Sequence, residues 1–240
     1  MPLKVLIIIP CFNEEKSIIT LLLELLAIDS LNEYHVSIAV VNDGSVDKTA
    51  EVVEQFRKTN LVLLDLPVNL GIGGAVQTGF KYALENDFDI AIQVDGDGQH
   101  PPAEISKLLN VYQETQCNIV IGSRFIAKQG FQSSGLRRMG IFYLRWLNKI
   151  FTQIDIYDIT SGFRLFDKKA IELVARNYPD EYPEPESLVI FAKAGFSIVE
   201  TPVIMKSRQS GKSSIRYFSQ LYYMIKVTIA MFFSYIRKVK

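Results

Sequence analysis

The sequence has little cysteine, little histidine and no excess of charge of either sign. Its 240 residues include two cysteines, two histidines and one tryptophan, and 26 basic residues balance 26 acidic ones. Cys11 and Cys117 are far apart and lack the short spacing of a metal site, which predicts buried free thiols in a reducing compartment. Because the net charge is zero, the chain has no overall basic field, and no nucleic-acid partner is expected. His35 and His100 stand alone and suggest no catalytic triad.

The N-terminus lacks a long apolar run. The stretch MPLKVLIII is only about as long as a strand, and it leads directly into PCFNEE. A secretory signal needs a longer apolar segment followed by a small-residue cleavage site, so the sequence predicts a cytoplasmic protein. There is also no internal repeat and no low-complexity linker, which predicts one large domain with, at most, an appendage.

Short apolar runs alternate with stretches of helical spacing through the first half of the chain. The expected strands are residues 5–9, 36–41, 61–64, 90–94 and 118–121, and the expected helices are residues 14–27, 47–56, 69–85 and 102–115. The apolar runs are continuous, which is typical of strands in a mostly parallel sheet covered by helices on both faces. Ligands of such α/β sheets bind at the carboxyl ends of the strands. Residues 10–14, 42–45 and 95–99 should therefore lie along one edge of the sheet.

The segment after the fourth apolar run contains two carboxylates, Asp95 and Asp97, separated by Gly96. Side chains two residues apart at a strand end point in roughly the same direction. Two such carboxylates repel each other unless a cation lies beside them. Mg²⁺ typically takes one or two carboxylates and completes its shell with substrate phosphates. The segment is therefore a candidate metal site, with a solvated turn as the alternative.

Seven motifs occur in a fixed order between about residue 3 and residue 215. They are PCFNEE, VNDGSVDKT, NLGIGGAVQTGF, VDGDGQHPPAEI, IGSRF, TSGFRLF and RQSGKSSI. Together they resemble family 2 inverting glycosyltransferases of the GT-A fold, most closely the dolichyl- and polyprenyl-phosphate branch. The resemblance implies a Rossmann-like, mostly parallel α/β sheet in a catalytic domain of residues 1–212. It also implies transfer of a sugar, with inversion and Mg²⁺ or Mn²⁺, from a nucleotide sugar to polyprenyl (undecaprenyl) phosphate for cell-surface glycan synthesis. UDP-glucose and UDP-N-acetylglucosamine are the favoured donors, and GDP-mannose is also compatible.

The same resemblance assigns roles on the donor side. The implied donor-binding residues are Pro10, Phe12, Glu14, Asp43, Asp95, Gly96, Arg208 and Lys212. The implied metal ligands are Asp95, Asp97 and Gln99. Two alternatives remain open: Asp43 as a simple turn residue, and glycines 71–74 as close-packing residues rather than a phosphate loop. The late motif departs from the family because it has Ser214 where the family usually has lysine, which leaves the donor sugar open.

On the acceptor side, the resemblance implies that Arg124 and either Arg137 or Arg138 face the acceptor phosphate. Asp97, Arg124 and Asp158 form the implied catalytic set, with Asp158 as a base, an arginine-orienting carboxylate or a structural partner of Arg164. Second choices for a base are Glu184 and Glu186. Two other functions remain open: a family 2 transferase acting on a sugar hydroxyl of a growing polysaccharide, and a non-catalytic nucleotide-sugar-binding scaffold.

Two stretches suggest contact with a membrane. Residues 136–151 interleave basic and aromatic side chains at helical spacing, which fits either an interfacial helix or a core helix. Residues 217–236 are long enough to span a bilayer but carry Lys226 in the middle. The sequence therefore favours a C-terminal amphipathic helix, within residues 213–240, held at the membrane or by a small membrane-protein partner. A transmembrane span is the alternative, and a homo-oligomer is also compatible. We expect peripheral attachment at the cytoplasmic face of the cell membrane.

Overall fold

The protein is built on one mixed sheet flanked by helices. The computed structural model describes residues 2–28, 31–57, 60–127, 135–206 and 217–237, with only the backbone described for 135–138 and 217–221. The described strands are β1 (Lys4–Cys11), β2 (His35–Asn42), β3 (Leu61–Asp65), β4 (Ile90–Gln93), β5 (Ile119–Ser123), β6 (Arg164–Asp167) and β7 (Ile198–Pro202). They form a sheet in the order β3-β2-β1-β4-β6-β5-β7. All neighbours are parallel except β6, which runs antiparallel to both β4 and β5.

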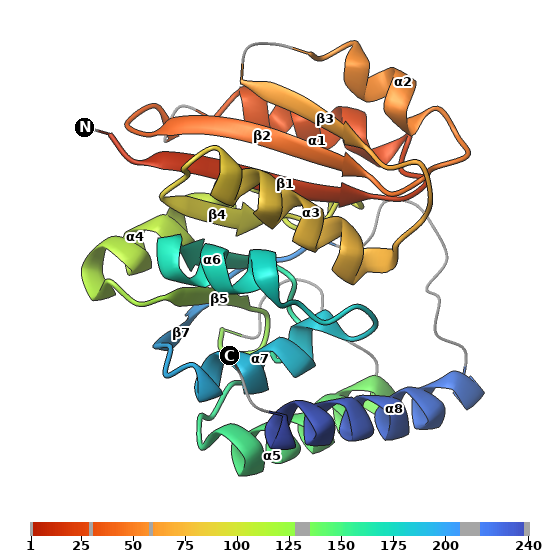
Figure 1. Cartoon of the computed structure of the whole chain (residues 1–240), viewed down its shortest axis with the longest axis vertical. Helices are drawn as coiled ribbons and strands as arrows, with labels where there is room; N and C mark the ends of the chain where they lie inside the picture. Colours follow the sequence, from red (N-terminus) through yellow and green to blue (C-terminus); the bar gives the residue numbers. More distant parts are fainter. Residues whose placement is uncertain (1, 29–30, 58–59, 128–134, 207–216, 238–240) are drawn as a thin grey trace.

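Helices cover both faces of this sheet (Figure 1). The described α-helices are α1 (Ser17–Leu26), α2 (Thr49–Glu54), α3 (Gly71–Glu85), α4 (Ile105–Thr115), α5 (Gly135–Thr152), α6 (Lys168–Arg176), α7 (Pro183–Lys193) and α8 (Tyr217–Ile236). Strand β1 divides its side chains between two core clusters, because successive residues of a strand point to opposite faces. Leu6 and Ile8 belong to the cluster that includes side chains of α3, α5, α6, α7 and α8, whereas Ile7 and Ile9 belong to the cluster that includes side chains of α1, α2 and α4.

The five strands expected from the sequence are confirmed, each within two residues of its expected ends. The expected helices are also present, although the one expected from Pro102 begins as a 3-10 turn over Pro102–Glu104 before α4. The mostly parallel α/β fold is therefore confirmed. Both cysteines are buried and free, as expected.

The C-terminal helix α8 packs against α5 and α7 at the lower end of the molecule (Figure 1). It buries Val227 and Met231 completely in the larger core cluster. Polar contacts also hold α8: the hydroxyls of Tyr143 and Thr228 are 3.0 Å apart. The expected boundary between residues 212 and 213 lies outside the described residues.

No helix within the described residues is both long and apolar enough to cross a membrane. The alternative that residues 217–236 form a transmembrane span is therefore not supported. The physical reason is their composition, because Lys226 and several polar side chains interrupt the apolar run.

Candidate active site

The predicted edge is present, because β1, β2 and β4 are parallel and their carboxyl ends lie on the same side of the sheet. Asp43 follows β2, and its backbone N–H donates to the carbonyl oxygen of Cys11 at 2.8 Å. Its carboxylate is buried and accepts a hydrogen bond from the backbone N–H of Leu70 at 2.7 Å. Asp43 thereby joins the end of β2 to the start of α3. This contact agrees with the alternative that Asp43 stabilises a turn, but the hydrogen bond from Leu70 uses only one of the two carboxylate oxygens.

The segment at the end of β1 faces the same edge. Pro10 is buried in the strand, whereas Phe12 immediately after it is 49% exposed. The backbone N–H of Glu14 donates to Thr49 Oγ1 at 2.9 Å, and its carboxylate accepts from the hydroxyl of Ser17. An exposed aromatic ring beside a buried carboxylate such as Asp43 offers a stacking surface and a hydrogen-bond acceptor at neighbouring positions.

The Asp95–Asp97 segment passes very close to the end of β1. A Cβ atom added to Gly96 would lie 2.6 Å from Cys11 Sγ and 3.0 Å from the Pro10 carbonyl oxygen, so only glycine fits there. Gly98 has a φ of +74°, a conformation that favours glycine. The turn is closed by Asp97, whose carboxylate accepts from the backbone N–H of Gln99 at 3.0 Å. The two glycines therefore fix where both carboxylates lie.

His100 supports this turn, a contact that the sequence did not reveal. Its Nδ1 accepts a hydrogen bond from the backbone N–H of Asp95 at 3.1 Å. Its Nε2 lies 3.8 Å from Asp95 Oδ2, and its ring stacks on Phe163 with centroids 5.0 Å apart. Since Nδ1 accepts, the neutral ring carries its proton on Nε2, facing the carboxylate. His100 is thus a buried support for Asp95.

The donor set at this turn fits a hard divalent cation. Asp95, Asp97 and Gln99 offer carboxylate and amide oxygens at one edge of the sheet. Among the described residues, no group of three or more His, Cys, Asp or Glu side chains is arranged to hold a metal ion. A partial set is what Mg²⁺ uses when substrate phosphates complete its shell. These residues are therefore compatible with Mg²⁺ or Mn²⁺ bound together with a diphosphate.

Arg124 and Asp158 form a buried ion pair at the end of β5. Arg124 Nε and Nη2 donate to the two carboxylate oxygens of Asp158, each at 2.7 Å. The Arg124 backbone N–H donates to the same carboxylate at 3.1 Å, and Nη2 also donates to Thr160 Oγ1 at 2.9 Å. Burial alone would lower the pKa of Arg124, but the hydrogen bonds and charge of Asp158 outweigh burial and raise it. Asp158 is fully buried, so its carboxylate is committed to orienting Arg124.

The expected alternative partner, Arg164, is occupied elsewhere. It is fully buried, and it donates to the carbonyl oxygens of Ser161 and Glu184 at 2.7 and 2.9 Å. It also donates to Ser187 Oγ at 3.0 Å. Burial lowers the pKa of Arg164. The suggested pairing of Asp158 with Arg164 is therefore wrong, because Arg164 binds α7 and the loop before β6.

Glu184, at the start of α7, lies within electrostatic reach of Arg164, Asp95 and Arg124. Burial, followed by the charge of Asp95, raises its pKa, although the charges of Arg164 and Arg124 oppose the shift. Glu186 points elsewhere, because Ser234 of α8 donates to its carboxylate at 2.6 Å. Of the two second-choice acids, Glu184 is therefore the one near Asp95 and Arg124.

The glycines at the start of α3 allow close packing. A Cβ atom on Gly73 would collide with the backbone of Pro179 and Asp180, and one on Gly74 would lie 2.6 Å from the Leu70 Cβ. This observation favours the close-packing interpretation over a phosphate loop at Gly73 and Gly74.

Four expected basic residues cannot be placed. Arg208 and Lys212 lie outside the described residues, and so do the side chains of Arg137 and Arg138 at the start of α5.

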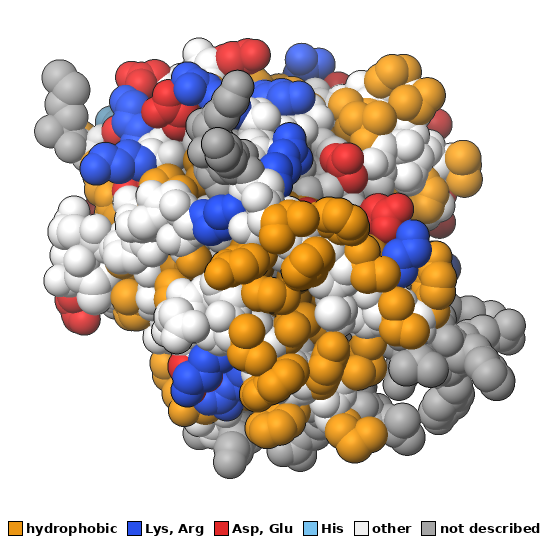
Figure 2. Space-filling model, turned by 60° about the horizontal axis from the view of Figure 1, so that its bottom comes forward, with side chains coloured by type: hydrophobic (Ala, Val, Ile, Leu, Met, Phe, Trp, Pro, Cys, Tyr) orange, Lys and Arg blue, Asp and Glu red, His pale blue; other side chains and the backbone are white. Residues whose placement is uncertain are grey.

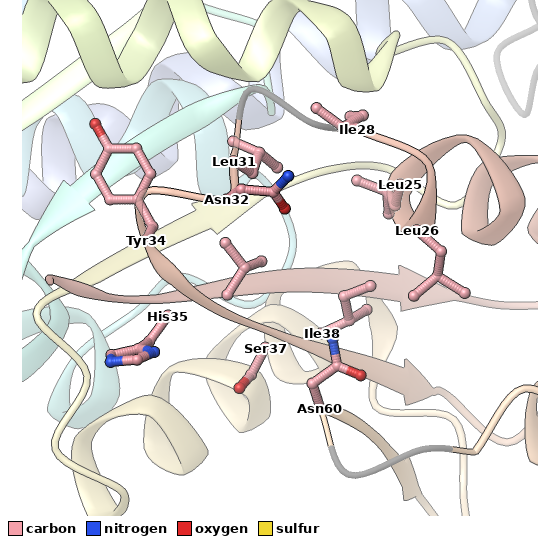
Figure 3. Close-up of a pocket in the computed structure, with 11 residues that line it drawn as sticks. Leu25, Leu26, Ile28, Leu31, Asn32, Tyr34, His35, Ser37, Ile38 and Asn60 are labelled. Carbon is pink, nitrogen blue, oxygen red and sulfur yellow. The ribbon is translucent and has the colours of Figure 1, made fainter.

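A hollow of about 440 Å³ lies at the opposite end of the strands (Figure 3). Tyr34, His35 and Leu31, at and just before the start of β2, line it together with Leu25 at the end of α1. Because Asp43 follows the other end of β2, this hollow is separate from the candidate active site.

Comparison with known proteins agrees with this geometry. The family model described as "Glycosyl transferase family 2" matches residues 6–174. The UDP-N-acetylglucosamine–dolichyl-phosphate N-acetylglucosaminyltransferase of Methanococcus voltae is 28% identical over 214 residues, 82% of this chain and 83% of that protein. The undecaprenyl-phosphate mannosyltransferase of Micrococcus luteus is 28% identical over 222 residues, 89% of this chain and 88% of that protein.

Solved structures agree on the fold. A mannosyltransferase from Pyrobaculum calidifontis, crystallised with GDP-mannose and Mn²⁺, superposes with a TM-score of 0.68 at 18% identity. The superposition covers 100% of this chain and 66% of that one. The family that the sequence motifs suggested is confirmed: the chain belongs to glycosyl transferase family 2.

Proposed function

We propose that the protein transfers one sugar from a nucleotide-sugar donor to a polyprenyl phosphate, with inversion at the anomeric carbon. The observation that carries the proposal is the buried Arg124–Asp158 pair, which holds a planar guanidinium within electrostatic reach of Asp95. A guanidinium held in one orientation by Asp158 offers a fixed positive charge to phosphate oxygens. Relatives named as dolichyl- and undecaprenyl-phosphate transferases support the same acceptor class.

The donor nucleotide would bind along the ends of β1 and β2. Phe12 offers an exposed ring for the base, and Asp43 a buried acceptor for its N–H groups. Pro10 and Glu14 border the same site, and Gly96 lets the sugar diphosphate approach the backbone. Arg208 and Lys212 remain expectations for this side. The relatives use different sugars, so the donor is proposed only as a UDP- or GDP-activated hexose or N-acetylhexosamine.

Asp95, Asp97 and Gln99 would hold Mg²⁺ or Mn²⁺ together with the donor diphosphate. Such an ion neutralises the negative charge of the departing diphosphate. On the acceptor side, Arg124 would bind the lipid phosphate, aided by Arg137 or Arg138. Asp158 keeps the guanidinium in one orientation, so the phosphate is held in line with the anomeric carbon.

The reaction does not require a strong base. An acceptor phosphate oxygen attacks the anomeric carbon, and the bond from that carbon to the nucleoside diphosphate breaks. A phosphate monoester is largely dianionic near neutral pH, with a second pKa of about 6, so no proton must be removed first. This agrees with the commitment of Asp158 to Arg124. A transferase acting on a sugar hydroxyl would instead need a free base, and Glu184 is the described acid best placed for that alternative.

The apolar surface of α5 and α8 supports attachment to a membrane. Large exposed apolar side chains gather on it (Figure 2). They are Met139, Phe142, Trp146 and Ile150 of α5, and Tyr222, Ile225, Ile229, Phe232, Phe233, Tyr235 and Ile236 of α8. A patch of this extent is unusual on a monomer in water and marks a partner or a membrane. The same segment carries two basic residues, the partly exposed Lys226 of α8 and the exposed Arg237 directly after α8, and basic groups near an anionic surface add about 1 kcal/mol each.

Peripheral attachment at the cytoplasmic face would bring the candidate active site to the lipid phosphate. In that arrangement α5 and α8 lie in the interface, and α8 also packs on the catalytic domain. A small membrane protein is the alternative occupant of the same surface.

The test is to incubate the protein with undecaprenyl phosphate and a panel of labelled nucleotide sugars. We expect one nucleotide sugar to yield a labelled lipid, and we expect its formation to require a divalent metal. A matched reaction with undecaprenol, which lacks the phosphate, should give no product. Label transferred to a soluble glycan but never to the lipid phosphate would favour the hydroxyl-acceptor alternative, and no transfer to any acceptor would favour a binding scaffold.

A further inference from the structure

Glu200 of β7 binds the loop that carries Asp158. Its carboxylate accepts hydrogen bonds from two consecutive backbone N–H groups, from Tyr157 at 2.7 Å and from Asp158 at 2.9 Å. Each oxygen accepts one of these bonds, so the carboxylate fixes both the position and the direction of the chain at Asp158. Burial raises the pKa of Glu200, and the two backbone bonds oppose that shift.

The next contact leads from Asp158 to Arg124. The Asp158 carboxylate binds both the guanidinium and the backbone N–H of Arg124 at distances of 2.7 to 3.1 Å. Any displacement of Asp158 must therefore move or release the guanidinium. Strands β5 and β7 are parallel neighbours, with Ile121 opposite Glu200, and Arg124 immediately follows β5. The contacts thus run from Glu200 on β7, through Asp158, to Arg124 at the end of the neighbouring strand β5.

The Asp158 loop has a second anchor at its exposed side. Asp155 accepts from Arg145 Nε and Nη2 at 2.8 and 2.9 Å, and the Arg145 guanidinium lies 3.6 Å from the centre of the Tyr157 ring. This ion pair is partly exposed, and exposed pairs contribute little to stability. Asp155 precedes Asp158 by three residues. Breaking the Asp155–Arg145 pair therefore serves as a control, because it loosens the same loop without removing the Glu200 contacts.

We propose that Glu200 is a positioning residue for the acceptor phosphate. It fixes the backbone of Asp158, which in turn presents the guanidinium of Arg124 to the lipid phosphate. The inference rests on the proposed function, and it adds a residue from an edge strand that no motif includes. Glu200 acts through Asp158, because both of its oxygens already accept backbone hydrogen bonds.

The first test is Glu200→Gln, which replaces one acceptor oxygen by an NH₂ group facing a backbone N–H. We expect kcat/KM for polyprenyl phosphate to fall on the order of tenfold, as for loss of a hydrogen bond to a charged group. The KM for the nucleotide sugar should stay at the wild-type value. Asp155→Asn should leave both parameters near wild type. Wild-type acceptor kinetics in Glu200→Gln, or equal losses in both variants, would overturn the proposal.

A double-mutant cycle separates positioning from general stability. In an Arg124→Lys background the fork is already lost, so adding Glu200→Gln should cost much less than it does in wild type. Additive losses would overturn the proposal.

A third measurement is independent of activity. Hydrogen exchange of the Arg124 Nε–H, followed by NMR of protein labelled in arginine, should be faster in Glu200→Gln than in wild type and Asp155→Asn. If the wild type transfers no sugar to any prenyl phosphate, the proposed function fails, and this measurement still decides the inference. Unchanged exchange in Glu200→Gln would overturn it.

Discussion

Replacing Trp146 by serine tests whether the apolar surface of α5 and α8 binds a membrane. Trp146 lies on α5, in the apolar surface shared with α8, and is 55% exposed. A point substitution is preferable to deleting α8, because α8 also buries Val227 and Met231 in the core. Removal of the whole helix would expose that core and confuse loss of membrane binding with loss of the fold.

The expected size of the effect follows from the exposed area. A tryptophan side chain buries up to about 250 Å², so the exposed half corresponds to about 140 Å². At about 25 cal/mol per Å², complete insertion of that area contributes about 3.5 kcal/mol, an upper limit for one side chain. Since about 1.4 kcal/mol is a tenfold change in an equilibrium constant, we expect the vesicle partition coefficient to fall between about tenfold and a hundredfold.

The assay is flotation with vesicles that contain anionic lipid, in low and high salt. Leu23→Ser is the matched control, because Leu23 is also 55% exposed but lies on α1, on the other face of the sheet. The control should float like wild type, and both variants should keep the wild-type melting temperature. Equal flotation of Trp146→Ser and wild type would refute the reasoning, and loss of a co-purified membrane protein instead would indicate a protein partner.

Three further predictions concern the candidate active site. Asp97→Ala should abolish transfer while costing only about 1 kcal/mol of stability, the worth of its turn hydrogen bond to Gln99; full activity in the variant, or in wild type with excess EDTA, would contradict this. Arg124→Lys keeps the charge but loses the fork, so kcat/KM for the acceptor should fall at least about tenfold, and near-wild-type kinetics would show that only charge matters. Burial raises the pKa of Glu184 above its ordinary value of 4.5, so its stabilising contribution is complete below that pH and is lost as the pH rises through the raised pKa. The free energy of unfolding in urea should therefore fall less for Glu184→Gln than for wild type over this pH range. Equal falls in the two proteins would count against a buried carboxyl at position 184.

Much of the first half of the fold could be predicted because its signals are local. Strands β1, β2 and β4 are continuous apolar runs, and polar segments directly follow them. Parallel strands bring their carboxyl ends to one edge, so the neighbourhood of Asp43 and Asp95 followed from chain order alone.

The second half of the fold depends on contacts between distant residues and could not be predicted in the same way. Strand β6 is only four residues long, and nothing in RLFD indicates that it runs antiparallel. The partner of Asp158 is 34 residues away, so the sequence left open whether it was a base or an orienting group. His100 likewise gave no sign that it supports Asp95. Tertiary packing, rather than any motif, decides these roles.

The most direct measurement of the central claim follows the acceptor oxygen. Undecaprenyl phosphate labelled with ¹⁸O in its terminal phosphate oxygens is incubated with the protein, a divalent metal and the active nucleotide sugar, and the product is analysed by mass spectrometry and ³¹P NMR. The account predicts a glycosyl phosphodiester in which ¹⁸O bridges the phosphorus and an anomeric carbon of inverted configuration. A product with retained configuration, or one whose anomeric oxygen carries no ¹⁸O, would contradict direct attack by the lipid phosphate.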